Sequence, residues 1–227
     1  MQHPYQTASR GTAFSWSRQY RRRRNAQARF GRIFDLPIAK RARDVAAACV
    51  ADGERVLEVG AGDRRLAHYL RQAAAGVQYE SVDIDPHGQH DYRSLTEPAG
   101  PYDGIVALEV IEHLELAEIP AWLSRLAELL RPGGWLVLST PNVYYPPDFL
   151  RDVTHRTPLC YDELAGLVSA AGLEVVSLRR IYNDALHRKL LRRYAFGWLF
   201  RLIGIDYARQ IVLVARRRGD ERLATSA

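Results

Sequence analysis

Hydrophobic and polar positions alternate in two rhythms from residue 55 onward. Short apolar runs are separated by segments in which apolar residues recur every three or four positions. The short runs are typical of buried strands, and the periodic segments are typical of helices. The pattern predicts strands over 55–59, 77–83, 103–108, 135–140, 173–179 and 209–216, and helices over 64–74, 119–130 and 161–171. This alternation is typical of a parallel sheet with helices on both faces.

The flanking segments follow other patterns. Residues 1–32 are polar and arginine-rich without sustained periodicity, so we expect them to be flexible unless docked. Asp35 before Leu36-Pro37 resembles an N-cap with proline in the first turn, which predicts a helix that ends at Asp52-Gly53. The expected organisation is an extension over 1–34, a domain over 35–218 with a helical insertion at 184–204, and a tail over 219–227.

Composition narrows the class of protein. The 227 residues suit one domain with appendages, and 47% hydrophobic with 26% charged residues is typical of a globular chain. Cys49 and Cys160 stand far apart, which argues against a zinc finger or a disulfide framework. We find neither a signal-peptide core nor an apolar run of about 18 residues. These features predict a cytoplasmic protein.

Charge is unevenly distributed along the chain. Residues 1–40 hold nine basic residues and one acidic residue, and residues 179–218 hold eleven basic and two acidic residues. Residues 41–178 hold eleven basic and twenty-one acidic residues. The basic ends indicate an anionic partner such as a membrane surface, phosphate or nucleic acid. Since 30 of the 32 basic residues are arginine, the excess could also reflect genome composition.

A glycine turn follows the first apolar run. The sequence Val56-Leu57-Glu58-Val59-Gly60-Ala61-Gly62-Asp63 runs directly into a predicted helix. Glycines allow a ligand to approach the backbone, and the amides at the helix start can donate hydrogen bonds. A dinucleotide motif requires a third glycine where Arg65 stands, and the P-loop motif is absent from the sequence.

A carboxylate ends the second predicted strand. Asp83 stands twenty-one residues after Gly62, in Ser81-Val82-Asp83-Ile84-Asp85. A carboxylate at the C-terminal end of such a strand can accept hydrogen bonds from both hydroxyls of a ribose. Together, the glycine turn and Asp83 favour a nucleoside ligand over a solvated turn or helix cap.

Two further motifs identify a family. The sequence E-V-I-E-H-L occupies 109–114, and R-P-G-G occupies 131–134, before the predicted strand at 135–140. With these motifs the chain resembles the class I S-adenosylmethionine (SAM)-dependent methyltransferases over about residues 35–218, similar to those that methylate ubiquinone precursors and glycans. The resemblance implies an α/β, Rossmann-like doubly wound fold. Its seven strands would follow the order 3-2-1-4-5-7-6, with strand 7 antiparallel.

The resemblance also implies the residues that bind the cofactor. Glu58, Gly60 and Gly62 match the loop beside the methionine portion of SAM. The remaining matches are Asp83 as the ribose-binding acid, Asp91 as the reader of the adenine amino group, and Glu109 at the strand end that borders the cofactor.

Two departures from the family pattern affect the cofactor site. Arg64 stands where the family has its third glycine, which crowds the start of the helix. The stretch between Asp83 and Asp91 is short, so the helix usually found there must be short or absent.

Methyl transfer to a hydroxyl also requires a base or a metal. In one hypothesis, His155 is a general base oriented by Asp152, as in enzymes that methylate sugars and quinone precursors, and His113 is a further catalytic residue. In another, Glu109, Glu112, His113 and His155 hold magnesium or manganese, as in small-RNA 3′-terminal 2′-O-methyltransferases. In a third, Glu112-His113 only caps and orients a loop. We predict the first, with no metal.

The expected function is therefore O-methylation of a small-molecule or glycan-like hydroxyl compound by SAM, with S-adenosylhomocysteine as product. Metal-dependent RNA 2′-O-methylation is one alternative. A non-catalytic SAM-binding scaffold is another, supported only by Arg64. Basic and aromatic residues mix over 184–204, which is suited to a membrane interface, an oligomer contact or an anionic substrate. We expect peripheral contact with an anionic membrane surface, and RNA is the less favoured partner.

Overall fold

The structure is a computed structural model that describes residues 16–219, apart from the side chains of Trp16, Leu186, Lys189 and Arg193. Within that range, seven strands form one sheet in the order β1-β6-β7-β5-β4-β2-β3. The strands are β1 (Ile38–Ala39), β2 (Arg55–Val59), β3 (Gln78–Val82), β4 (Tyr102–Leu108), β5 (Leu130–Pro141), β6 (Leu173–Ile181) and β7 (Gln210–Arg217). Strand β7 pairs antiparallel with β5 and β6, and the other pairs are parallel.

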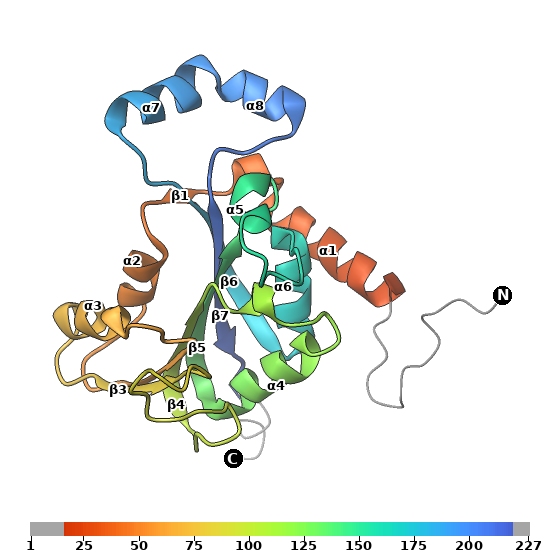
Figure 1. Cartoon of the computed structure of the whole chain (residues 1–227). Coiled ribbons are helices and arrows are strands. Elements are labelled where there is room, and N and C mark those ends of the chain that lie inside the picture. Colours follow the sequence, from red (N-terminus) through yellow and green to blue (C-terminus); the bar gives the residue numbers. More distant parts are fainter. Residues whose placement is uncertain (1–15, 220–227) are drawn as a thin grey trace, which may run out of the picture.

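Helices cover both faces of the sheet (Figure 1). The helices are α1 (Trp16–Phe30), α2 (Ala42–Ala47), α3 (Arg65–Ala73), α4 (Ile119–Leu129), α5 (Pro146–Leu150), α6 (Tyr161–Ala170), α7 (Leu186–Leu190) and α8 (Gly197–Ile203). Short turns of other helix types are η1 (Ile33–Asp35), η2 (Ile111–His113) and the π-helical η3 (Leu191–Ala195). One apolar core includes residues of α1, α4 and α6, and a second includes residues of α2 and α3. The predicted doubly wound α/β class is confirmed.

The sheet differs from the expected order at its edges. The six strands predicted from the apolar runs are all present, in their expected relative order. The family's third strand, expected beyond β3, is reduced to an isolated parallel bridge between Val82 and Tyr92. The seventh strand is β1, at the opposite edge, where it pairs with β6.

The helix predicted from Asp35 is wrong in its first half. Residues 33–35 form a single turn, Ile38–Ala39 form β1, and the helix begins only at Ala42. Long-range hydrogen bonds hold this segment extended: the Arg180 backbone N–H donates to the Pro37 carbonyl at 2.8 Å, and its guanidinium donates to the carbonyls of Leu36 and Phe34. Tertiary contacts thus override the local helical pattern.

Part of the N-terminal extension forms a docked helix. Helix α1 packs on α6, where Gln19 donates to the Glu163 carbonyl at 3.1 Å and Gln27 donates to the Asp162 carboxylate at 2.6 Å. The arginine-rich segment is therefore structured by tertiary contacts from residue 16 onward. Residues 1–15 of the extension and 220–227 of the tail lie outside the described part of the chain.

Helices α7 and α8 stand apart from the sheet, beyond β1, in Figure 1. They and η3 lie within the stretch where one or two helices were predicted, between β6 and β7. Over residues 16–219, every helix is too short or too polar to cross a bilayer.

Candidate active site

The C-terminal ends of neighbouring parallel strands bring the predicted cofactor residues together. Gly60 and Gly62 follow β2, Asp83 follows β3, and Glu109 follows β4. These three strands are adjacent in the sheet and parallel, so their ends meet at one edge. Ligands of open α/β sheets bind in the crevice at this edge.

Gly60 makes the tight turn that the sequence predicted. Its φ is +71°, a region that favours glycine, and a Cβ there would clash with the Val110 side chain. Gly62 also has a positive φ, of +48°, but a Cβ on Gly62 would meet no atom within 4 Å. The backbone at Gly62 therefore borders open space.

Asp83 connects the glycine turn to the next strand. Its carboxylate accepts hydrogen bonds from the Gly62 N–H at 2.7 Å and the Asp85 N–H at 2.9 Å. Burial tends to raise the pKa of Asp83, but the two backbone N–H groups and nearby positive charges together hold that pKa below its usual range. The carboxylate is therefore ionised and able to accept further hydrogen bonds.

Glu58 is buried near the end of β2. Its carboxylate accepts a hydrogen bond from the Tyr79 hydroxyl on β3. Burial raises the pKa of Glu58 to about 7, although the hydrogen bond from Tyr79 opposes the shift. In this arrangement Glu58 cross-links β2 to β3 beneath the glycine turn.

Arg64, at the position of the family's third glycine, lies in a backbone region that favours glycine. Its φ is +57°, and its guanidinium donates to the Gln89 carbonyl at 2.6 Å and to the Asp91 carboxylate at 3.3 Å. The same Asp91 oxygen accepts bonds from the Ser81 N–H and hydroxyl. Asp91 thus lies at the cofactor edge, but one of its oxygens is occupied by protein groups.

Glu109 lies at the end of β4 in a strained conformation. Its φ is +57°, which is uncommon for a residue other than glycine and concentrates at functional sites. Ser139 of β5 holds it, since the Ser139 hydroxyl donates to the Glu109 carboxylate at 2.7 Å. Burial raises the pKa of Glu109, and Ser139 partly offsets the effect.

Glu112 is buried without a hydrogen bond to its carboxylate. It is 0% exposed, and neither oxygen has a partner among the described residues. The nearby Thr140 hydroxyl is also unpartnered within that part of the chain. Burial and then the charge of Glu109 raise the pKa of Glu112 to about 8. A buried carboxyl with no partner is costly, so this position points to a ligand or a bound proton.

His155 is oriented by a backbone carbonyl. Its Nδ1 lies 2.8 Å from the Phe149 carbonyl oxygen, which can only accept, so Nδ1 carries the proton. This tautomer leaves the lone pair on Nε2, the atom that a general base or a metal ligand requires. Phe149, whose ring centroid lies 5.0 Å from that of His155, is a positioning residue that sequence reasoning missed.

Asp152 does not make the orienting bond that was predicted. Its carboxylate lies 3.9 Å from His155 Nε2 and accepts hydrogen bonds from the Thr154 N–H and hydroxyl. These bonds lower the pKa of Asp152. Asp152 thus places a negative charge on the reactive side of His155, and the orientation comes from Phe149. No sequence pattern could reveal a backbone carbonyl in that role.

The structure brings His113 to the same place. The ring centroids of His113 and His155 lie 4.9 Å apart, and the Thr154 hydroxyl lies 3.0 Å from His113 Nδ1. One ligand atom each from Glu112, His113 and His155 lies within 4.8 Å of the others. This donor set fits a divalent cation, which these three residues would hold. Glu109 is not part of this cluster.

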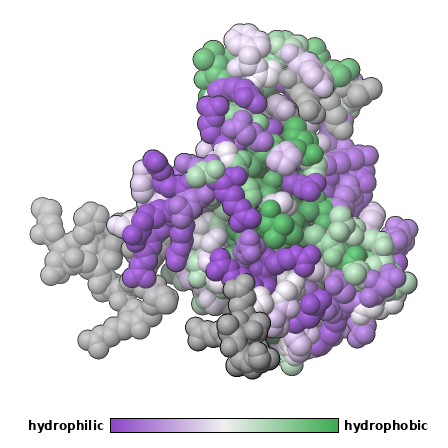
Figure 2. Space-filling model, turned by 180° about the vertical axis from the view of Figure 1, so that it is seen from behind, coloured by the Kyte–Doolittle hydropathy of each residue, from purple (hydrophilic) through white to green (hydrophobic). Residues whose placement is uncertain are grey.

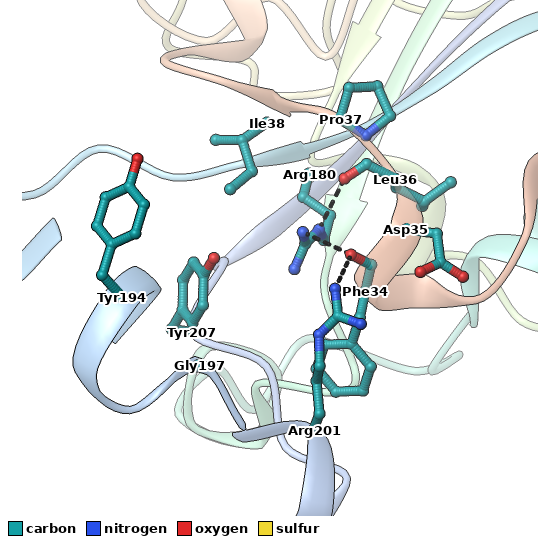
Figure 3. A pocket seen from close by; sticks show the side chains of 10 residues that line it. All are labelled: Phe34, Asp35, Leu36, Pro37, Ile38, Arg180, Tyr194, Gly197, Arg201 and Tyr207. Atoms are coloured by element: carbon teal, nitrogen blue, oxygen red, sulfur yellow. Dashed lines mark hydrogen bonds between the residues drawn. The ribbon is translucent and has the colours of Figure 1, made fainter. Parts of the chain in front are cut away.

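A separate cavity of about 490 Å³ lies beside helix α8 (Figure 3). The η1–β1 segment with Phe34 and the α7–α8 segment with Arg201 line it, together with Arg180 of β6 and Tyr207, which precedes β7. A second cavity, of about 400 Å³, shares Phe34 and Arg201 and includes Tyr144, just after β5.

The fold and the residues at its edge define a SAM-dependent methyltransferase class. A family model described as "Methyltransferase domain" matches residues 20–178. The chain belongs to this family, as the resemblance predicted.

Curated relatives and a solved structure agree with this assignment. The chain is 29% identical over 201 residues to a ubiquinone biosynthesis O-methyltransferase from Burkholderia vietnamiensis, covering 74% of this chain and 79% of that protein. It is 31% identical to one from Bradyrhizobium diazoefficiens, but the match covers only half of each protein. A SAM-dependent methyltransferase from Archaeoglobus fulgidus shares the fold, with a TM-score of 0.57 and 17% identity over 86% of this chain and 94% of that one.

Proposed function

We propose that the protein transfers a methyl group from SAM to the hydroxyl of a small-molecule or glycan-like acceptor. The observation that supports it best is His155, whose Nδ1 is fixed on the Phe149 carbonyl so that Nε2 is free to take a proton. The names of the relatives favour a hydroxylated quinone precursor as the acceptor class.

Each residue has a defined task in this proposal. Gly60 and Gly62 admit the cofactor to the backbone, and Asp83 accepts hydrogen bonds from its ribose hydroxyls. Bound SAM supplies an electrophilic methyl group on a sulfonium and leaves as S-adenosylhomocysteine. His155 Nε2 takes the acceptor's proton as the new O–C bond forms and the C–S bond breaks. The negative charge of Asp152, 3.9 Å away, stabilises the resulting imidazolium.

The test is a transfer assay with methyl-labelled SAM and a panel of catechols, phenolic acids, glycans and short RNAs. We expect label on a small hydroxyl compound, and His155→Ala to reduce the rate by roughly 10²–10⁴-fold, the usual contribution of a general base. His68→Ala, at an exposed histidine of α3, is the matched control and should leave the rate unchanged. Label on RNA alone would contradict the proposal.

A second candidate is metal-dependent RNA 2′-O-methylation. The unpartnered carboxylate of Glu112 beside His113 and His155 favours it. A metal held there would polarise the ribose hydroxyl that is to be methylated. A third candidate, the non-catalytic scaffold, depends on Arg64 blocking the cofactor, and SAM binding by the intact protein would argue against it.

We also propose that the protein works in the cytoplasm in peripheral contact with an anionic membrane surface. The excess of basic residues over 1–40 and 179–218 supports this contact, because anionic headgroups attract such segments.

A further inference from the structure

The segment from Asp184 to Gly204 exposes bulky apolar side chains away from the body of the protein. Helices α7 and α8 form an arch that stands clear of the sheet in Figure 1. In Figure 2 the same projecting part shows hydrophobic residues on its surface. The apolar side chains of this segment that are at least half exposed include Leu190, Leu191, Trp198, Leu202 and Ile203.

One side of helix α8 is tied to the body. The Phe200 ring packs against Tyr207 with centroids 5.4 Å apart. The Arg201 guanidinium donates to the Phe34 carbonyl at 3.4 Å and lies over the Phe34 ring, beside the cavity shown in Figure 3. These contacts fix which side of α8 faces inward.

The other side of α8 is apolar and points to solvent. Trp198 and Leu202, one helical turn apart, are 64% and 74% exposed. Arg201, which faces inward, is the single charged residue between Gly197 and Ile203. Because the inward side is already occupied, the arch cannot bury Trp198 and Leu202 against its own body without breaking the contacts to Tyr207 and Phe34.

The charge of the α7–α8 segment indicates which kind of partner its exposed apolar surface binds. Residues 184–204 contain the basic residues Arg188, Lys189, Arg192, Arg193 and Arg201 and one acidic residue, Asp184. Arg188 and Arg192 share the Asp184 carboxylate and Arg201 contacts Phe34, but five basic residues against one acidic residue still leave the segment strongly positive. A symmetric contact with a second copy would place two such basic segments together, which like-charge repulsion opposes. An anionic lipid surface satisfies both features, because it attracts the basic residues and accepts the apolar side chains.

The described side chains of the other basic segment, on helix α1, expose little apolar surface. On α1, Arg23 pairs with Asp162 and Glu163, and Arg29 pairs with Glu174. Within the described part of α1, Tyr20 is the one exposed large apolar residue. Helix α1 is therefore used mainly to dock on α6.

We infer that the outer side of α8, with Trp198 and Leu202 at its centre, is the surface that docks on an anionic membrane. The inference rests on the membrane contact proposed above and is independent of the chemistry of methyl transfer.

Co-sedimentation with vesicles tests this assignment. The intact protein is mixed with phosphatidylcholine vesicles that contain or lack phosphatidylglycerol, over a salt series. We expect binding only with phosphatidylglycerol, weakened but not abolished by high salt, because apolar insertion is not screened. The Trp198→Ser/Leu202→Ser variant should bind about tenfold more weakly or worse. The control Tyr20→Ser/Val176→Ser, at exposed apolar sites away from the arch, should bind at least half as well as the intact protein.

Tryptophan quenching by brominated phosphatidylglycerol gives a second measurement. The Trp198→Phe variant keeps an apolar ring, so it should bind normally but lose the quenching seen with the intact protein. Thermal melting of each variant shows whether it is folded.

The outcomes separate the two proposals. If the intact protein fails to bind anionic vesicles even at low salt, the membrane contact itself is wrong. If it binds and the Trp198→Ser/Leu202→Ser variant binds equally well, the contact exists but α8 does not make it. If that variant instead converts a dimer to a monomer without changing lipid binding, the surface belongs to a second copy.

Discussion

The carboxylate of Asp83 accepts a hydrogen bond of 2.7 Å from the backbone N–H of Gly62. This bond joins the turn after β2 to the end of β3, so the two cofactor motifs form one rigid edge. The open space at Gly62 lies beside a carboxylate whose pKa is held below its usual range. In the proposed function, this edge binds the ribose of SAM.

Removing this carboxylate should weaken cofactor binding. We expect Asp83→Ala to reduce SAM affinity by roughly 1–3 kcal/mol, because a paired acceptor is lost in a partly buried site. Isothermal titration measures the change. Asp44→Ala, at an exposed position of α2, is the control and should bind SAM normally. A folded Asp83→Ala protein with unchanged affinity would remove Asp83 from the site.

The two glycines of the turn should respond differently to alanine. Gly60→Ala meets both an unfavourable φ and the Val110 side chain, so urea unfolding should show a loss of roughly 2–4 kcal/mol. Val110→Ala should recover part of that loss in the double variant. Gly62→Ala has room around its Cβ, so it should cost only about 1–2 kcal/mol of stability. Equal losses at both positions would contradict the geometry.

The buried carboxyl of Glu112 should make stability depend on pH. Its pKa is about 8 in the folded protein, raised from 4.5, so the folded state binds more protons between those values. Stability should therefore fall as pH rises from about 5 to 8, by at most about 1.4 kcal/mol per pH unit from this group. In chelator-treated protein, Glu112→Gln should make the free energy of unfolding depend less on pH. The variant should gain most stability over the intact protein at pH 8. If the stability of the Glu112→Gln variant changed with pH in the same way as that of the intact protein, Glu112 would already be ionised in the folded state.

Chelation distinguishes the two catalytic hypotheses. We expect methyl transfer to persist in excess chelator, because the proposal assigns proton removal to His155 Nε2. The measurement is labelled transfer before and after exhaustive chelation, followed by readdition of magnesium or manganese. Complete loss that either ion reverses, reproduced by Glu112→Ala, would favour the metal and the RNA hypothesis.

Much of the fold could be predicted because its strands are buried apolar runs. Val56 and Leu57 in β2 and Leu136 and Val137 in β5 are fully buried, so their place in strands follows from hydrophobicity, whereas the order of the strands followed from the family resemblance. The segment around Leu36 could not be predicted in this way. Its extended conformation depends on hydrogen bonds to Arg180, nearly 150 residues away in the sequence.

The candidate site was predictable where a motif fixes the backbone, as at Gly60, Gly62 and Asp83. Elsewhere, the group that orients a site residue does not belong to any sequence motif. His155 is oriented by the Phe149 carbonyl and not by Asp152, and Arg64 adopts a glycine conformation while its side chain binds Asp91. The docking of α1 likewise depends on α6, a long-range contact that the periodicity of its own residues does not encode.

Isothermal titration of the intact protein with SAM and S-adenosylhomocysteine tests the central claim most directly. The edge formed by Gly60, Gly62 and Asp83 predicts saturable binding of both ligands with one-to-one stoichiometry. Adenosine should compete with both, because the same carboxylate would hold its ribose. If neither SAM nor S-adenosylhomocysteine bound at about 1 mM, the account would be contradicted. A dissociation constant of about 1 mM corresponds to a binding free energy near −4.1 kcal/mol.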